Sequence, residues 1–180
     1  MTKLIILDRD GVINQDSMQY IKSVNEFKLL PGSVRAIAML SKAGYRIGVA
    51  TNQSGIARGY YDKAQLEAIH EKMITHVREA GGSIDIIEYC PHMPDYGCTC
   101  RKPSPGMLIA IAKHFNEKLL GVPFVGDRIS DIQAAETVGA KPLLVLSNMT
   151  DRIGLNAYPH VPVFNSLLEC VETYLLTHDA

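Results

Sequence analysis

Two aspartates, Asp8 and Asp10, have the clearest potential for chemistry in this sequence. They follow the short apolar run at residues 4–7 and are separated from each other by one residue. Such a run predicts a buried strand, and its carboxyl end is the place where open α/β sheets bind ligands. Two carboxylates at that end would repel each other. Mg²⁺ would relieve this repulsion and leave one carboxylate free to attack an electrophile.

Three further groups of polar residues follow other predicted strands or precede a predicted helix. They are Thr51 with Asn52, Arg101 with Lys102, and Asp127 with Asp131. Residues that follow different strands of a parallel sheet meet along one edge, so we expect an acidic cluster beside hydroxyl, amide and cationic donors. Phosphoryl transfer needs this combination, because it depends mainly on positioning and charge stabilisation. One carboxylate can form an aspartyl-phosphate while a second transfers protons.

Three of the four groups have a plainer explanation when they are taken alone. Asp8 and Asp10 could be an N-cap or an Asx turn, and Thr51 with Asn52 could be only a cap. Asp131 could simply place a negative charge at a helix N-terminus, and its role stays open. The meeting of all four groups at one edge favours an active site.

A cluster of cysteines and one histidine precedes Arg101. Cys90, His92, Cys98 and Cys100 form a C-x-H pair, a five-residue spacer and a C-x-C pair. Three thiolates and one imidazole are the ligands of a closed structural Zn²⁺ site, which would fix the loop without taking part in catalysis. The alternatives are reduced surface cysteines or a redox pair, although C-x-C without a helix start activates thiols poorly. Cys170 is expected to be a buried apolar residue.

Strands and helices alternate along the sequence. The predicted strands are residues 4–7, 45–50, 84–89, 122–125 and 143–146. The predicted helices are residues 34–40 with Ser33 as N-cap, 63–80, 105–114, 132–138 and 166–176. This order predicts an α/β fold of three layers, a Rossmann-like parallel sheet with helices on both faces. No insert is long enough for a large cap domain, and residues 1–180 are expected to form one domain.

The composition limits the function classes. Eighteen Lys and Arg against nineteen Asp and Glu give a net charge of −1, which argues against nucleic acid as a partner. The sequence contains no apolar stretch of about 18 residues and no signal-peptide pattern, so we expect no membrane partner and a cytoplasmic protein. We also expect a monomer. The cysteines do not suggest a disulfide framework.

The four polar groups carry a resemblance. Residues 8–14, 51–55, 101–103 and 126–131 match, in order, the four motifs of the haloacid dehalogenase superfamily of phosphatases. The sequence resembles this superfamily from residue 4 to about residue 146. The resemblance implies that Asp8 is the nucleophile and Asp10 the general acid and base. It further implies that Thr51 and Lys102 stabilise the phosphoryl group. The implied Mg²⁺ ligands are Asp8, the backbone carbonyl of Asp10, and Asp127.

The cysteine loop joined to Arg-Lys-Pro resembles one branch of this superfamily, which acts on heptose 1,7-bisphosphate or on histidinol phosphate. The run 51–61 resembles the heptose type, because the histidinol type usually has Asp where Ser54 stands. Arg128, in contrast, is shared with the histidinol type. The resemblance implies removal of the C7 phosphate of the heptose, in the biosynthesis of nucleotide-activated heptose for lipopolysaccharide or other surface glycans. The alternatives are a histidinol-phosphate phosphatase and a catalytically silent phosphate-binding protein.

A small phosphorylated sugar suits the basic residues. Arg58, Arg101 and Arg128 are more cations than one transferring phosphate needs, and arginine can hold a second phosphate with two hydrogen bonds. The residues expected to contact substrate are Asp16, Ser17, Met18, Gln19, Tyr20, Thr51, Asn52, Gln53, Ser54, Arg101, Lys102 and Arg128. The histidines other than His92 show no partner pattern and receive no function.

Overall fold

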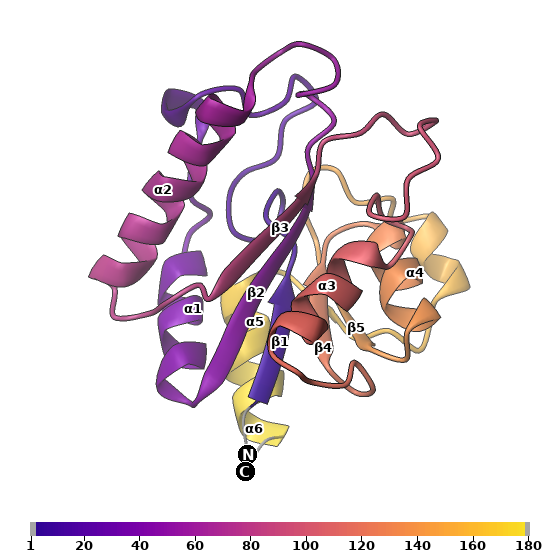
Figure 1. The fold of residues 1–180 in the computed structure, drawn as a ribbon. Coiled ribbons are helices and arrows are strands. Elements are labelled where there is room, and N and C mark those ends of the chain that lie inside the picture. The colour runs from indigo at the N-terminus through magenta and orange to yellow at the C-terminus, as the bar shows by residue number, and fades with distance from the viewer. Residues whose placement is uncertain (1–2, 179–180) are drawn as a thin grey trace.

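A six-stranded parallel β-sheet lies at the centre of the computed structural model, which describes residues 3–178 (Figure 1). Its strands are β1 (Lys3–Leu7), β2 (Tyr45–Asn52), β3 (Ile86–Cys90), β4 (Pro123–Gly126), β5 (Lys141–Val145) and β6 (Val163–Phe164). The strand order is β3-β2-β1-β4-β5-β6, and every pair is parallel. The chain therefore reverses its direction of growth between β3 and β4, beside β1. Open α/β sheets bind ligands at such a switch point.

The apolar run of β1 is buried on both faces of the sheet. Ile5 and Leu7 belong to one hydrophobic cluster, and Leu4 and Ile6 belong to another on the opposite face. This alternation is the period of two that a strand imposes on its side chains. Because β1 pairs with both β2 and β4, the residue after Leu7 emerges between the ends of two neighbouring strands.

Helices cover both faces, which confirms the predicted three-layer α/β architecture (Figure 1). The first face carries α1 (Ser33–Lys42), α2 (Lys63–Glu79) and α5 (Leu167–Cys170). After α5 the chain continues as a π-helical turn at Val171–Leu175 and as α6 (Leu176–His178). The second face carries α3 (Gly106–His114) and α4 (Ile129–Thr137). Short 3₁₀ helices lie at Val24–Glu26 and Gly154–Ala157.

Several boundaries differ from the predictions for physical reasons. Ser33 is the first residue of α1 and does not cap it; the cap position is Gly32, at a φ of 78°. The third strand begins at Ile86 because the Asp85 carboxylate accepts a hydrogen bond from Ile47 N and its N–H donates to Ile47 O. Helix α4 begins three residues earlier than predicted, at Ile129, because the Asp131 carboxylate accepts from Arg128 N.

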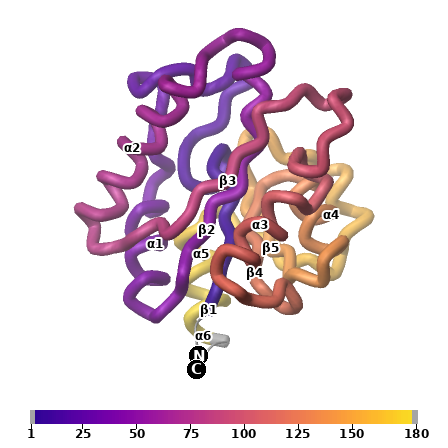
Figure 2. The backbone as a smooth tube through the Cα atoms, in the orientation of Figure 1, coloured from indigo at the N-terminus to yellow at the C-terminus, as the bar shows by residue number. Residues whose placement is uncertain are grey.

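Loops gather at the carboxyl edge of the sheet, by which we mean the end where the strands finish. In Figure 2 the loops that follow β1, β2 and β3 all lie at this edge, opposite the side where the tube enters β1. The candidate site residues therefore share one edge, as the predicted topology requires.

Across residues 3–178, no helix is both long and apolar enough to cross a membrane.

Candidate active site

Three aspartates meet at the carboxyl edge. Asp8 follows β1 and its N–H donates to Val125 O on β4 at 2.9 Å. Asp127 follows β4, and Asp131 lies in the first turn of α4. One carboxylate oxygen of each lies within 4.8 Å of the others, and all three side chains are buried. The structure therefore places Asp131, whose role the sequence left open, within the predicted acidic cluster.

Glycine at position 11 makes this approach possible. Gly11 has a φ of 85°, a conformation that residues with a Cβ rarely adopt. A Cβ built there would lie only 2.0 Å from Asp127 Oδ2. The loop after β1 therefore turns against the Asp127 carboxylate at a distance that only glycine permits.

Lys102 supplies positive charge to the cluster. Its Nζ lies 3.0 Å from Asp8 Oδ1 and 2.7 Å from Asp131 Oδ1, and it donates to Ala50 O at 3.0 Å. Burial alone would lower the pKa of Lys102, but Asp131 and Asp8 raise it above its ordinary value. The backbone is held as well, since Lys102 N donates to Asn52 Oδ1 and Asn52 Nδ2 donates to Lys102 O. Asn52 thus anchors the loop that carries the cation.

The acidic cluster favours protonation when no further cation is near. Burial, followed by the charge of Asp131, raises the pKa of Asp8 well above its ordinary value. The same two causes raise the pKa of Asp127 to about 7. Ser147 Oγ donates to Asp127 Oδ2 at 2.6 Å, but the buried Asp127 Oδ1 has no hydrogen-bond partner among the described residues. An unpaired buried carboxylate oxygen beside two other carboxylates fits a hard divalent cation.

Asp10 is held from two sides. Its Oδ1 accepts from Arg9 Nε at 3.0 Å, Arg9 Nη2 at 2.7 Å and Asn14 Nδ2 at 2.9 Å. Its Oδ2 accepts from Gln53 Nε2 at 3.1 Å. Burial opposes ionisation, but Arg9 and these hydrogen bonds together lower the pKa of Asp10. Arg9 and Asn14 lie within the motif at residues 8–14, but the sequence alone assigns neither of them a role.

The run after β2 continues this network. Gln53 Nε2 also donates to the buried Thr51 Oγ1 at 2.9 Å, and Tyr61 OH donates to Gln53 Oε1. Burial raises the pKa of Tyr61 to about 12, so the phenol remains a donor. Gly55 leaves room for the tyrosine ring, since a Cβ there would lie 2.1 Å from Tyr61 Cε1. Thr51 is therefore fixed beside Asp10 by a shared partner.

A cavity of about 660 Å³ opens over these side chains. Eleven of the twelve residues expected to contact substrate line it: Asp16, Ser17, Met18, Tyr20, Thr51, Asn52, Gln53, Ser54, Arg101, Lys102 and Arg128. Gln19 does not line it; its N–H donates to Ser17 Oγ and its carbonyl accepts from Lys22 Nζ. Met149 and the cysteine-loop residues Pro94 and Gly97 also border the cavity, although no sequence pattern points to them.

Arginines lie on two sides of the cavity. Arg101 Nη1 is buried and has no hydrogen-bond partner among the described residues. Arg128 Nη2 forms an ion pair with Asp16 Oδ2 at 2.7 Å, which joins the start of α4 to the loop after β1. Arg58 does not line the cavity, and its guanidinium lies 5.7 Å from the centre of the Tyr20 ring. Two of the three arginines therefore line the cavity.

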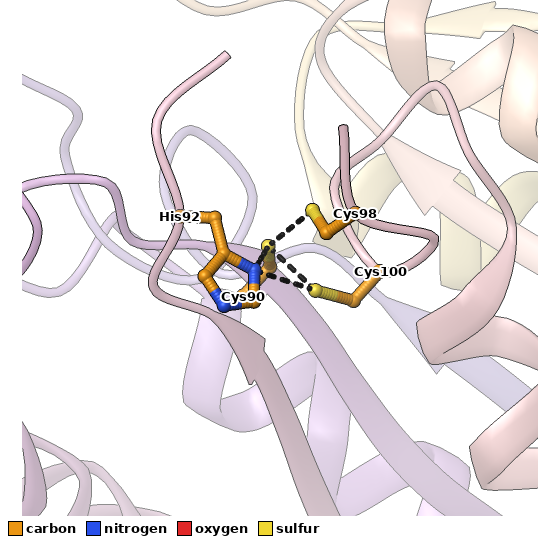
Figure 3. Close-up of side chains that lie close together, drawn as sticks. All are labelled: Cys90, His92, Cys98 and Cys100. Carbon is orange, nitrogen blue, oxygen red and sulfur yellow. Dashed lines mark hydrogen bonds between the residues drawn. The ribbon is translucent and has the colours of Figure 1, made fainter. Parts of the chain in front are cut away.

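The four predicted zinc ligands come together in the loop after β3 (Figure 3). His92 Nδ1 lies 3.5 Å from Cys90 Sγ and 3.3 Å from Cys100 Sγ. Cys90 Sγ is 3.6 Å from Cys98 Sγ and 2.8 Å from Cys100 Sγ. Tetrahedral zinc with Zn–S bonds of about 2.3 Å separates its sulfurs by about 3.7 Å, so a zinc ion fits after a small adjustment. Cys170 is fully buried in the core, as expected.

The cysteine cluster is tied to the cavity by a hydrogen bond from Arg101 N to Cys98. Burial opposes ionisation of Cys98, but this bond and those from His92, Cys100 and Cys90 lower the pKa of the thiol to about 6. A thiolate is the form that binds zinc. The Tyr96 ring stacks on His92 with 4.2 Å between ring centres. The cluster therefore fixes the backbone directly before Arg101 and Lys102.

An aspartate cluster with a buried lysine, at the carboxyl edge of a three-layer α/β fold, defines a class of phosphoryl-transfer hydrolases. Comparison with known proteins agrees: the HAD-hydrolase-like family model matches residues 99–170. Together with the relatives described next, this match shows that the chain belongs to the haloacid dehalogenase-like hydrolases, as its motifs predicted.

Similar proteins include several that are named as phosphatases of heptose 1,7-bisphosphate. A Pseudomonas putida protein named D-glycero-beta-D-manno-heptose-1,7-bisphosphate 7-phosphatase is 59% identical over 150 residues, covering 83% of this chain and 86% of that protein. A Neisseria meningitidis serogroup A protein of the same name is 45% identical over 182 residues, covering 99% and 97%. A solved structure of D,D-heptose 1,7-bisphosphate phosphatase from B. bronchiseptica, complexed with magnesium and phosphate, has a TM-score of 0.91 and 46% identity, with 99% and 100% coverage.

Proposed function

We propose that this protein is a magnesium-dependent phosphatase that removes the C7 phosphate of D-glycero-β-D-manno-heptose 1,7-bisphosphate. The observation that carries the chemistry is the buried Asp8 carboxylate beside the Lys102 ammonium, at the floor of a cavity lined by arginines. The names of relatives up to 59% identical support the substrate. They do not favour the histidinol-phosphate alternative.

Asp8 is the nucleophile. Its carboxylate attacks phosphorus to form an aspartyl-phosphate, while the sugar oxygen departs. Lys102 neutralises phosphate oxygens from its position 3.0 Å from Asp8 Oδ1, and Thr51 offers its hydroxyl to them. Asp8, the backbone carbonyl of Asp10 and Asp127 would hold Mg²⁺, which would add positive charge that favours the ionised carboxylates and would help to stabilise the transferring group.

Asp10 transfers the protons. It donates one to the departing sugar oxygen and then removes one from the water that hydrolyses the aspartyl-phosphate. Its hydrogen bonds with Arg9, Asn14 and Gln53 favour the carboxylate, which is the form needed for the second step. The negative charge of a bound phosphate ester favours proton uptake by a neighbouring carboxylate, which prepares Asp10 for the first step.

The second phosphate of the substrate accounts for the remaining arginines. Arg101 Nη1 has no partner among the described residues, and Arg128 can exchange part of its ion pair with Asp16 for a phosphate contact. Asp16, Ser17 and the residues 51–54 are suited to sugar hydroxyls. A structural Zn²⁺ bound by Cys90, His92, Cys98 and Cys100 would keep Arg101 in place. All these residues belong to a single chain, so a monomer suffices.

The proposed function is tested by following the site of hydrolysis. Purified protein is incubated with heptose 1,7-bisphosphate and Mg²⁺, phosphate release is measured, and the remaining phosphate is located by phosphorus NMR. The expected product carries only the C1 phosphate, and chelation of Mg²⁺ stops turnover. Removal of the C1 phosphate, or undiminished turnover without divalent cations, would contradict the assignment.

The nucleophile is tested with Asp8→Asn, which removes a charge with little change of shape. The expected loss in kcat is at least about 10³-fold, with circular dichroism unchanged. Asp95→Asn, on the exposed part of the cysteine loop, is the matched control and should keep its activity. Near-normal turnover by the Asp8 variant would exclude covalent catalysis by that residue.

A further inference from the structure

Arg9 occupies the position between the two catalytic aspartates and is completely buried. Its Nε and Nη2 donate to Asp10 Oδ1, and its Nη1 lies 3.1 Å from His70 Nε2. The Phe27 ring covers the guanidinium at 5.7 Å. Arg9 is therefore clamped between Asp10 on one side and helix α2 on the other.

His70 is the residue of α2 that makes this contact. A guanidinium only donates hydrogen bonds, so His70 Nε2 has to accept and the ring proton belongs on Nδ1. Burial, together with the charge of Arg9, lowers the pKa of His70 to about 3, which keeps the ring neutral. His70 is only 7% exposed, so bulk water cannot take the place of its ring as the hydrogen-bond partner of Arg9.

We infer that His70 is a positioning residue, which acts through Arg9 to hold the Asp10 carboxylate in the orientation needed for proton transfer. This inference rests on the proposed function, in which Asp10 is the acid and base. A proton donor has to lie within hydrogen-bond reach of the departing oxygen, and small displacements reduce the rate strongly. Gln53, held by Tyr61, restrains the other oxygen of Asp10, so the carboxylate is fixed from both sides.

Two substitutions separate the hydrogen bond from the bulk of the ring. His70→Phe keeps a planar ring but removes the acceptor, which leaves Arg9 Nη1 buried without a partner and favours its displacement. His70→Gln keeps an acceptor oxygen at about the place of Nε2 and should restore the function.

The readout is the dependence on the leaving group. Heptose 1,7-bisphosphate releases an alcohol that needs a proton, whereas p-nitrophenyl phosphate releases a phenolate that does not. For His70→Phe we expect kcat/KM to fall about 10-fold with the sugar and less than about 2-fold with the aryl ester, because only the first requires the acid. The loss with the sugar should fall on kcat with little change in KM. His70→Gln should lie within about 3-fold of the original protein on both substrates.

A structural control comes from the same helix. Val77 is fully buried on α2, two turns beyond His70 and about 10 Å away along the helix axis. Val77→Ala should lower the melting temperature without changing the ratio of the kcat/KM values for the two substrates. Equal losses on both substrates for His70→Phe, or no loss on either, would overturn the inference. If the original protein hydrolysed neither substrate, the proposed function would fail instead, and the role of His70 with it.

Discussion

At the residue scale, the site holds more negative charge than its own lysine can balance. The carboxylates of Asp8, Asp127 and Asp131 lie within 4.8 Å of one another and share the single ammonium of Lys102. Like charges in a buried cluster disfavour ionisation, which is why the pKa values of Asp8 and Asp127 are raised. A site arranged in this way is ready for a divalent cation and is unfavourable without one.

This charge imbalance predicts how the stability of the metal-free protein depends on pH. The pKa of Asp127 is about 7 in the folded protein and near 4 in an unfolded chain. Between these values the folded state binds more protons, so the stabilisation is complete below about pH 4 and is lost as the pH rises through 7. The loss from this group is on the order of a few kcal/mol.

Thermal unfolding measured from pH 5 to pH 8 tests this dependence. We expect the melting temperature to fall with rising pH in the presence of a chelator, and to fall less with Mg²⁺ present. Asp127→Asn should flatten the profile, whereas Asp95→Asn on an exposed loop should not. A melting temperature that does not change with pH in the metal-free protein would show that repulsion among the carboxylates does not destabilise the folded state.

Residues that follow strands could be found from the sequence, and their partners could not. Asp8, Thr51 and Asp127 were located because an apolar run that ends in a polar residue has a local pattern. The contact between Arg9 and His70 joins residues 61 positions apart in the chain, and no local pattern records it. The predicted cap Ser33 is wrong by one position, because a residue type alone does not fix where a helix begins. Gln19, an expected substrate contact, does not line the cavity.

At the scale of elements, the loop between β3 and α3 positions Arg101 and Lys102 at the site, as β1 positions Asp8. The loop has no regular secondary structure, and the cysteine cluster supplies its restraint. Metal binding of this kind contributes directly to local folding. The order of this loop should therefore depend on bound zinc, whereas the order of the sheet should not.

This dependence gives a prediction for Cys98. Freshly prepared reduced protein should carry one zinc per chain, and Cys98→Ser should lower the zinc content and raise KM, because Arg101 loses its support. The measurements are elemental analysis and steady-state kinetics. Cys170→Ala is the matched control: it removes a thiol from the core and should leave the zinc content unchanged. Reduced protein without zinc would contradict the structural-site interpretation.

The long elements were predictable and the short ones were not. Five strands and the helices between them follow from apolar periodicity over several residues. β6 has only two residues, too few to show alternation. The predicted helix 166–176 begins one residue later, at Leu167 after its cap Ser166, and its middle is a π-helical turn, which the apolar pattern does not distinguish from an α-helix.

At the scale of the whole molecule, the parallel sheet determines where catalysis can occur, and the loops determine which substrate the site accepts. In the described residues 3–178, the cavity is bordered by the loop after β1, the cysteine loop and the start of α4. Selectivity therefore has to come from side chains such as Arg101, Arg128 and Asp16 on these loops. These loops cannot be derived from the fold class alone, because the same sheet supports many substrates.

The most direct test of the central claim compares kcat/KM for heptose 1,7-bisphosphate and for histidinol phosphate, measured on the same preparation with Mg²⁺ present. Two arginines that face the cavity should favour the substrate with a second phosphate. Each charged contact is worth a few kcal/mol, so the predicted preference for the heptose is at least about 10²-fold, and Arg101→Ala should reduce it. An equal or higher kcat/KM for histidinol phosphate would contradict the assignment.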